Sequence, residues 1–348
     1  MSQILTFLGK GGVGKTHLAI AIAKSYAKQG KKVLLVGQEI DGGLLMLGQK
    51  FDCEPRLLPD FPNLKVAQLQ ATTLLAAYWE KMKGAEAQFL RTPFFQEVYG
   101  QELGILPGMD QALALSWLRE QDQQGEYDLI IYDGAGDLTT LRMLGMPEIL
   151  GWYLRRFRQV LTSSSLGQTI APFVEPMLRS VMQVSGDIST QAGQMTDVLK
   201  LGADAVNDPQ RVIAYLVTSA NPAAIASAKY LWGSAQQVGL TVGGVFSRDA
   251  LDPAIFIPLQ VTIIPDSYSD LSLDFESAPP PMTIDLTHQQ VKLFLPSFDK
   301  KQVKLIQSGP EITIEAGDQR RNLFLPPTLA GKPAMGAKFQ DGYLIISF

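Results

Sequence analysis

The chain has 348 residues, of which 46% are hydrophobic and 18% are charged, and its formal net charge is -4. Such a length and composition are typical of a folded protein of about two domains, and they exclude a disordered chain. The net charge gives no reason to expect binding to nucleic acid. One cysteine, Cys53, and two histidines exclude an internal disulfide and a paired-cysteine zinc site, so we also expect no zinc.

The first 36 residues predict a strand, a glycine-rich loop, a helix and a second strand. The two strands are expected at residues 4–8 and 33–36, and a helix over 17–29 ends at Gly30. The first apolar stretch is too short for a signal peptide, and no stretch approaches the roughly 18 apolar residues of a membrane span. We therefore expect no integral membrane span and a cytoplasmic or plastid-type interior location.

The glycine-rich loop fits the phosphate-binding pattern G-x-x-x-x-G-K-[ST] at every fixed position. Its backbone N–H groups and the positive end of the following helix are expected to surround the phosphates of ATP. We expect Lys15 to reach the β- and γ-phosphates and the Thr16 hydroxyl to bind Mg²⁺. The alternative is a glycine-rich turn without a ligand, which the flanking strand and helix disfavour. The predicted nucleotide-binding residues of this loop are Gly9, Lys10, Gly11, Gly12, Val13, Gly14, Lys15, Thr16 and His17.

Three further apolar runs predict buried strands at residues 129–132, 212–218 and 243–246. Strands that alternate with helices indicate an α/β fold, a doubly wound and mostly parallel sheet. Ligands of such sheets bind at the carboxyl ends of the strands. Asp133 follows one of these strands directly, and we expect it to hold Mg²⁺ through a water molecule.

Two long stretches, 70–120 and 143–208, do not follow the sheet pattern and predict helical insertions. Each contains an apolar helix face, and the second is rich in methionine. These faces either pack on the sheet and on each other, or form a groove for a protein client. The first face contains Leu74, Leu75, Tyr78, Trp79 and Met82. The second contains Phe173, Val174, Met177, Leu178, Val181 and Met182, of which Met177 and Met182 are our candidate client-groove residues.

The last part of the chain changes character after a proline run. We expect an ATPase domain over 1–278, a linker over 279–282 and a small antiparallel β-sandwich over 283–348. Short strand-like runs with turn signals between them support this prediction. They cover residues 283–286, 291–295, 303–306, 312–314, 322–325 and 343–348.

Two motifs carry a resemblance to a known family. With Lys10, the loop reads K-G-G-V-G-K-T and resembles the deviant Walker A motif of P-loop ATPases that include ArsA, the Get-type targeting ATPases, MinD, ParA and the nitrogenase iron protein. Residues 133–142, D-G-A-G-D-L-T-T-L-R, resemble switch II of the ArsA/Get family. The switch II residues are Asp133, Gly134, Ala135 and Gly136, and the last three are expected to move when the γ-phosphate leaves. The resemblance implies a homodimer in which Lys10 reaches the partner's nucleotide. The alternative for Lys10 is a solvated loop charge.

Other family positions match less closely. The switch I aspartate, which orients the attacking water, aligns with Glu39, and Asp41 lies two residues later as a second candidate. For adenine contacts the resemblance points to Ser247, Arg248 and Pro265. Residues 320–327 and 336–344 resemble the α-crystallin-like domain that one clade of this family carries at its C-terminus.

The family resemblance implies a homodimeric factor that hydrolyses ATP and holds hydrophobic protein segments, among them segments of membrane proteins. It also implies that nucleotide binding and hydrolysis drive an open-closed cycle of this factor. Two alternatives remain, an ATP-dependent metabolic enzyme and a MinD- or ParA-type partitioning ATPase. An arsenite-pump subunit and a nitrogenase-type reductase both need cysteines that this chain lacks.

Overall fold

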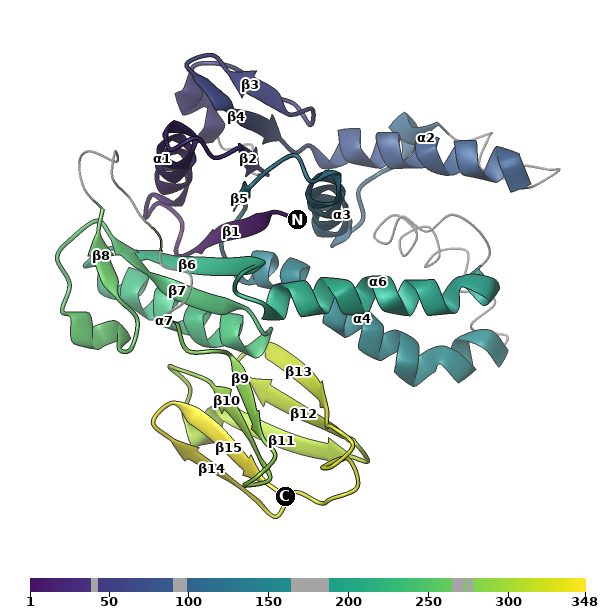
Figure 1. The fold of residues 1–348 in the computed structure, drawn as a ribbon, viewed down its shortest axis with the longest axis vertical. Coiled ribbons are helices and arrows are strands. Elements are labelled where there is room, and N and C mark those ends of the chain that lie inside the picture. Colours follow the sequence, from purple (N-terminus) through teal and green to yellow (C-terminus); the bar gives the residue numbers. More distant parts are fainter. Residues whose placement is uncertain (39–42, 90–98, 164–187, 265–272, 274–277) are drawn as a thin grey trace.

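The computed structural model describes residues 1–38, 43–89, 99–163, 188–264, 273 and 278–348, which form an α/β domain and a β-sandwich (Figure 1). Several candidate residues of the sequence analysis lie outside the described residues. They are Glu39, Asp41, Met177, Met182 and Pro265.

The α/β domain is built on one eight-stranded sheet with the order β3-β4-β2-β5-β1-β6-β7-β8. Only the edge strand β3 is antiparallel to its neighbour, so the predicted doubly wound, mostly parallel sheet is confirmed. The sequence analysis did not predict β3 and β4, because polar residues interrupt the apolar pattern there. The strands are β1 Gln3–Leu8, β2 Val33–Gly37, β3 Arg56–Leu58, β4 Phe61–Gln68, β5 Leu129–Asp133, β6 Val212–Thr218, β7 Thr241–Ser247 and β8 Val261–Ile263.

Helices bury both faces of this sheet. Side chains of a strand alternate between two faces, so Leu34 and Val36 join a hydrophobic cluster with α2, α3, α4 and α7, while Val33 and Leu35 join one with α1. The α-helices are α1 Lys15–Lys28, α2 Ala71–Phe89, α3 Met109–Gln124, α4 Leu138–Ser163, α6 Ile188–Asn207 and α7 Pro222–Gln237. Short 3₁₀ turns are η1 Gly43–Leu47, η3 Gly100–Glu102, η4 Pro253–Phe256 and η5 Lys300–Gln302.

The apolar face of α2 belongs to the core. Leu74, Leu75 and Tyr78 are 5% to 6% exposed and share a hydrophobic cluster with Trp117 of α3. For this face, packing within the domain is therefore the correct interpretation of the sequence pattern. The second predicted face, around Met177, lies outside the described residues.

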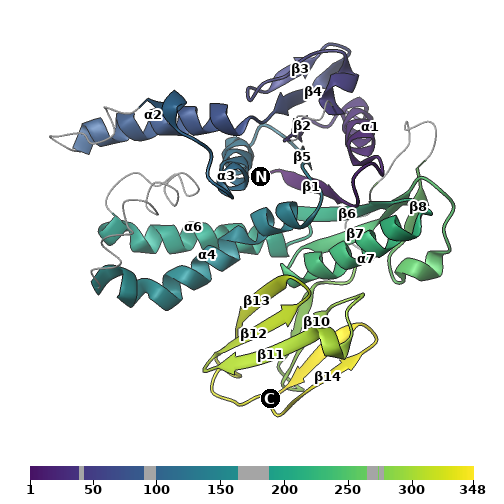
Figure 2. The same ribbon diagram turned by 180° about the vertical axis from the view of Figure 1, so that it is seen from behind.

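Helices α2, α4 and α6 extend beyond the sheet on the same side of the molecule (Figures 1 and 2). Gly202 of α6 lies against Pro147 of α4, where an added Cβ would come within 3.1 Å of the proline ring. A glycine there lets the two helices approach closely. Among the helices of the described ranges, none combines the length and apolar character needed to cross a membrane.

The β-sandwich that the tail predicts is confirmed. It has a four-stranded sheet of order β14-β15-β10-β9 and a three-stranded sheet of order β11-β12-β13. Residues such as Leu293, Ile314 and Ile346, all 0% exposed, fill its core. The strands are β9 Met282–Asp285, β10 Gln290–Phe294, β11 Val303–Ser308, β12 Glu311–Ala316, β13 Gln319–Phe324, β14 Gly336–Gln340 and β15 Tyr343–Ser347. The sequence analysis did not identify β14 as a strand.

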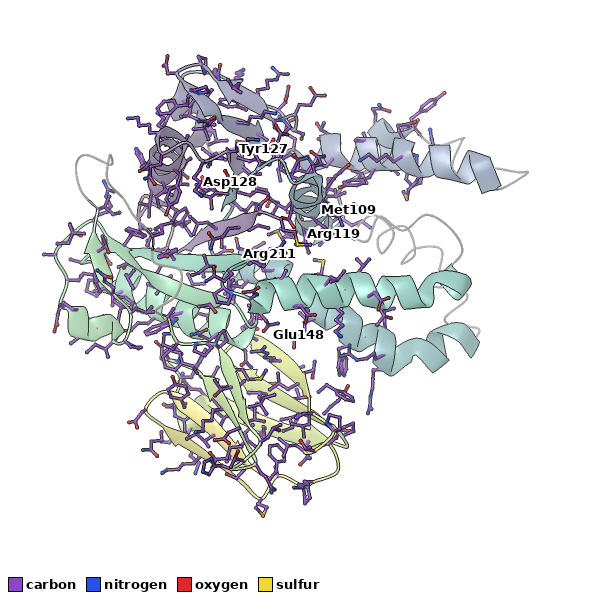
Figure 3. The ribbon with its side chains drawn as sticks, viewed as in Figure 1. Met109, Arg119, Tyr127, Asp128, Glu148 and Arg211 are labelled. Atoms are coloured by element: carbon purple, nitrogen blue, oxygen red, sulfur yellow. The ribbon has the colours of Figure 1, made fainter. Side chains whose placement is uncertain are left out.

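A buried arginine anchors the sandwich to the α/β domain. Arg321 of β13 is 3% exposed and donates to Asn207 Oδ1 at 2.8 Å and to the Gln236 carbonyl at 3.4 Å. It lies 3.7 Å from the carboxylate of Glu148 on α4. Glu148 is labelled in Figure 3. Burial raises the pKa of the Glu148 carboxyl and lowers the pKa of the Arg321 guanidinium. Arg321 therefore depends on Glu148 for compensation of its charge, while Glu148 has Arg321 as its larger and Arg155 as its smaller compensating charge.

We predict that Arg321→Ala lowers the free energy of unfolding by roughly 3 kcal/mol, because it leaves the largely buried Glu148 without its partner. Glu148 keeps 24% of its side chain exposed, which places the loss at the low end for a broken buried pair. The matched control is the neighbouring Arg320→Ala. Arg320 is 73% exposed and pairs with Glu315 at 2.8 Å, so its loss should change stability little. Urea denaturation measures both, and equal losses would contradict the prediction.

Candidate nucleotide site

The strand order brings the two nucleotide motifs together. β1, which precedes the phosphate-binding loop, lies beside β5, which precedes switch II. The Gly9 N–H donates to the Gly136 carbonyl at 2.8 Å and so joins the loop to switch II. On the next strand, β2, the Gln38 N–H donates to the Asp133 carbonyl at 3.1 Å. Thus the chain leaves β2 beside the start of switch II, at the residue before the predicted switch I segment.

The backbone of the phosphate-binding loop needs its glycines. Gly12 and Gly14 have φ values of 83° and 100°, a conformation that side chains disfavour. Around Gly11 and Gly12, no heavy atom lies within 4 Å of where a Cβ would be. The loop therefore presents open backbone next to the N-terminus of α1, as a phosphate cradle requires.

Lys15 holds the loop together from inside. Its ammonium group donates to the carbonyls of Gly9 at 3.1 Å and Lys10 at 3.5 Å. Lys10 is itself exposed, in contrast to the half-buried Lys15. The two lysines therefore differ in position, one within the loop and one on its outer side.

The loop, switch II and α7 line a cavity of about 800 Å³, which is within the usual range for sites of small ligands. Predicted nucleotide residues that line it are Gly9, Lys10, Gly11, Gly12, Gly14, Lys15, Thr16, His17, Gly134, Ala135 and Arg248. Val13 and Asp133 are 5% and 8% exposed and do not line this cavity.

The structure does not bring Ser247 to this cavity. Its side chain is 0% exposed, and its hydroxyl donates to the Asp249 carbonyl at 2.7 Å. Arg248 does line the cavity, and its Cδ lies 3.7 Å from a Cβ built on Gly14. Of the two adenine candidates that the structure describes, Arg248 is thus the one next to the phosphate loop.

Sequence reasoning missed several residues of the cavity. Ser227, Tyr230 and Leu231 come from α7 and Met46 comes from η1. No motif marks these positions, and only the packing of α7 beside the loop reveals them. Asp137 and Leu138 also line the cavity and directly follow the predicted switch II residues.

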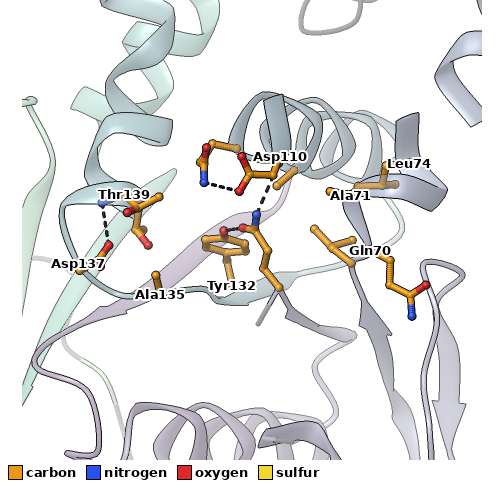
Figure 4. Close-up of a pocket in the computed structure, with 13 residues that line it drawn as sticks. Gln70, Ala71, Leu74, Asp110, Tyr132, Ala135, Asp137 and Thr139 are labelled. Carbon is orange, nitrogen blue, oxygen red and sulfur yellow. Dashed lines mark hydrogen bonds between the residues drawn. The ribbon is translucent and has the colours of Figure 1, made fainter. Parts of the chain in front are cut away.

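A second cavity of about 390 Å³ lies next to switch II (Figure 4). Ala135 and Asp137 line both cavities, so both border switch II. In the second cavity the Tyr132 hydroxyl donates to the Gln38 side chain, whose amide donates to the Asp110 carbonyl at 3.5 Å. These bonds connect β5, the start of switch I and the first turn of α3.

At Gly136, switch II lies close to Lys15 and to β1. The φ of Gly136 is 65°, and an added Cβ would lie 2.4 Å from Lys15 Cε and 2.6 Å from the Phe7 carbonyl oxygen. Such distances are shorter than any ordinary carbon contact, so only glycine fits between Lys15 and β1. The Gly136 N–H donates to Thr140 Oγ1 at 3.0 Å, which joins switch II to α4.

The residues present fit Mg²⁺ bound together with a nucleotide. Magnesium is usually held by one or two protein oxygens and by the phosphates of the substrate rather than by a protein cage. The half-buried Thr16 hydroxyl lines the cavity, as such an arrangement needs. Within the described ranges, no group of three or more His, Cys, Asp and Glu side chains is placed to hold a metal by itself.

A phosphate-binding loop hydrogen-bonded to a switch at the end of a parallel strand defines a P-loop nucleotide hydrolase. The family model of ArsA ATPases, described as anion-transporting ATPases, matches residues 2–251. An HSP20-like domain found in ArsA matches residues 287–348. The chain therefore belongs to the ArsA ATPase family, it is an ATPase, and the predicted resemblance of its tail to an α-crystallin-like domain is confirmed.

Curated relatives carry two kinds of name. A protein of Prosthecochloris vibrioformis with the name of an arsenical pump-driving ATPase is 25% identical, over 99% of this chain and 96% of the relative. ATPase get3 of Schizosaccharomyces japonicus is 30% identical over 53% of this chain and 52% of its own length. An ATPase ASNA1 homolog of Entamoeba histolytica is 32% identical over 41% of this chain and 45% of its own length.

We predict that Gly136→Ala lowers kcat/KM for ATP roughly 100-fold, because displacement of a reactive group by about 1 Å has an effect of this size. The added methyl group would displace Lys15 or switch II. The control is Gly104→Ala, since Gly104 has ordinary backbone angles and no heavy atom near a Cβ. Phosphate release measures both variants, and wild-type turnover in Gly136→Ala would show that this close contact is not required.

Proposed function

We propose that this protein is a homodimeric ATPase whose nucleotide cycle opens and closes a binding surface for hydrophobic protein segments. The observation that carries the proposal is that switch II continues directly into α4. The Asp137 carboxylate accepts from the Thr139 N–H at 2.7 Å and caps this helix. A displacement of switch II is therefore transmitted to α4.

Helix α4 connects the nucleotide cavity to the projecting helices. It is 26 residues long and packs against α6, and both extend beyond the sheet on the same side (Figure 2). Exposed apolar residues occur on both, with Tyr153 of α4 at 51% and Leu201 of α6 at 66% exposed. Single exposed apolar residues are common, so they support the proposal only together with their place on these helices.

Switch II has room to move. The second cavity, like the first, is lined by Ala135 and Asp137. Loops that contact the γ-phosphate change position when it is lost, and in this way they report hydrolysis to the rest of a protein. Here the second cavity provides space next to switch II for such a change.

In the proposed reaction, the chain's residues bind and orient ATP for attack by water. Lys15 and the loop N–H groups would bind the phosphates, Thr16 would hold Mg²⁺, and Asp133 would act on the metal through a water molecule. Magnesium, when bound, neutralises charge that develops on the phosphates. Glu39 and Asp41 remain the two candidates for orienting the attacking water. Arg248 contacts the base, and Pro265, outside the described residues, is the other candidate.

The proposed clients are hydrophobic helices, including membrane-destined protein segments. The resemblance to Get-type ATPases and the names of the get3 and ASNA1 relatives support this choice. We take the stretch with Met177 and Met182 as the client-contacting segment, because flexible methionine side chains adapt to varied apolar partners. We also propose that the protein works in the cytoplasm or in a plastid-type interior.

The arsenical pump names of other relatives suggest a second function, arsenite-dependent ATP hydrolysis. Cys53 makes this less favourable. Burial raises the pKa of its thiol, the sulfur accepts from the Gln70 N–H at 3.3 Å, and the chain has no other cysteine. One largely protonated thiol per subunit provides a poor site for a metalloid that binds thiolates.

We predict that Lys10→Ala lowers ATP turnover roughly 1,000-fold while ATP affinity changes little, because a cation supplied from the partner acts on charge that develops during transfer. Lys15→Ala should instead lose ATP binding. The control is the exposed Lys31→Ala, on the turn after α1. Kinetics and a fluorescent ATP analogue measure both effects.

A mixing experiment tests whether Lys10 acts across the dimer. A mixed dimer of Lys10→Ala and Lys15→Ala subunits holds one complete site, because the Lys15→Ala subunit still provides its Lys10. Random exchange makes about half of the dimers mixed, so about a quarter of wild-type turnover should return. A mixture as inactive as its two components would show that Lys10 acts only within its own subunit.

We predict that Met177→Asp combined with Met182→Asp abolishes capture of an apolar helical peptide of about 20 residues, the length of a membrane anchor. ATP turnover and dimer mass should remain, since neither residue belongs to the proposed ATP site. The control is Met335→Asp, at a methionine 76% exposed on the sandwich. Pull-down and sedimentation measure the outcome. An unfolded double variant would identify the stretch as core, and unimpaired capture would place the client elsewhere.

A further inference from the structure

One turn of the β-sandwich contacts two helices of the nucleotide site at once. Asp318 lies in the turn between β12 and β13, and its carboxylate pairs with the guanidinium of Arg142 on α4. Its backbone N–H donates to the Tyr230 hydroxyl of α7 at 3.1 Å. Gly317, with a φ of 59°, precedes it, and an added Cβ there would lie 3.0 Å from the same hydroxyl. The turn therefore fits closely against both helices.

Both helices contribute residues to the lining of the nucleotide cavity. Tyr230 lines it directly, and so does Leu138, the first residue of α4. Arg142 lies one helical turn after Leu138, just beyond Thr140, whose hydroxyl accepts from the Gly136 N–H of switch II. A side chain held at Arg142 thus restrains the turn of α4 that carries switch II.

We propose that the β12–β13 turn is a positioning element for ATP hydrolysis, with Asp318 holding the switch II end of α4 through Arg142 and fixing the Tyr230 phenol in the cavity lining. The proposal goes beyond client binding and needs only the ATPase site. It assigns the sandwich a role in the catalytic cycle, and the two contacts of Asp318 act on different kinetic constants.

The contacts of Asp318 are not needed to attach the sandwich. Arg321 and its buried partners already anchor it, and Phe298 packs edge-on against Tyr230 with ring centroids 5.9 Å apart. The side chains of Arg142 and Asp318 are 56% and 64% exposed, so their ion pair adds little to stability. Stability and positioning can therefore be separated by experiment.

The test is steady-state ATP hydrolysis by the full chain. Asp318→Asn keeps the size and the backbone N–H but removes the charge, so kcat should fall roughly five-fold or more, the lower end of typical coupling between sites. The KM for ATP and the midpoint of thermal unfolding should stay as in the wild type. Tyr230→Phe removes the hydroxyl that accepts from the Asp318 N–H. It should raise the KM for ATP roughly five-fold, which corresponds to the free energy of one neutral hydrogen bond.

The matched control is Glu315→Gln on the same sheet. Glu315 also holds basic side chains, Lys304 at 2.9 Å and Arg320 at 2.8 Å, but these contacts stay within the sandwich. This variant should keep wild-type kinetics. Asp318→Arg should lose turnover as Asp318→Asn does, and its combination with Arg142→Asp should recover it, since the reversed pair restores the attraction.

Two results would overturn the proposal. One is wild-type kcat in Asp318→Asn. The other is a fall in kcat that accompanies an equally lowered unfolding midpoint and is not recovered by charge reversal, which would leave the turn a structural role only. A loss of kcat at unchanged stability, with Glu315→Gln unaffected and with recovery in the reversed pair, supports it.

Discussion

The hydrogen bond from the Gly9 N–H to the Gly136 carbonyl joins the phosphate-binding loop to switch II, and the surrounding structure depends on the close approach that it requires. Gly136 lies so close to Lys15 and to the Phe7 carbonyl that no side chain fits. The phosphate-binding loop and the predicted switch II segment are therefore in direct contact. Neither can move far without a change in the other.

Helix α4 carries this contact away from the site. The helix begins beside Gly136. The Thr140 hydroxyl of α4 accepts from the Gly136 N–H of switch II, and the Asp137 carboxylate accepts from the Thr139 N–H in the first turn of α4. The helix then packs against α6 and extends beyond the sheet. A helix is stiff along its axis, so a small tilt at its first turn becomes a larger displacement at its far end. This geometry gives a physical route from phosphate chemistry to the projecting helices.

The sandwich is more than an attached domain because it touches α4 and α7 together. Its buried contacts, centred on Arg321, hold it in place, whereas its exposed contact at Asp318 adds little stability. Trp152 of α4 also donates to Glu311 of β12 at 3.2 Å. The contacts of α4 with the sandwich therefore extend over about three turns of the helix, from Arg142 to Trp152.

The sequence by itself determined the P-loop, switch II, the parallel sheet and the β-sandwich, because each depends on local patterns: glycine spacing, apolar runs and turn residues. Only the tertiary structure decided that the apolar face of α2 is core, since an amphipathic helix looks the same whether a sheet or a client covers it. It also decided that Tyr230 lines the nucleotide cavity and that Ser247 is turned away from it. The contact of Asp318 with Arg142 joins positions 176 residues apart, and such a pairing follows from packing rather than from any local pattern.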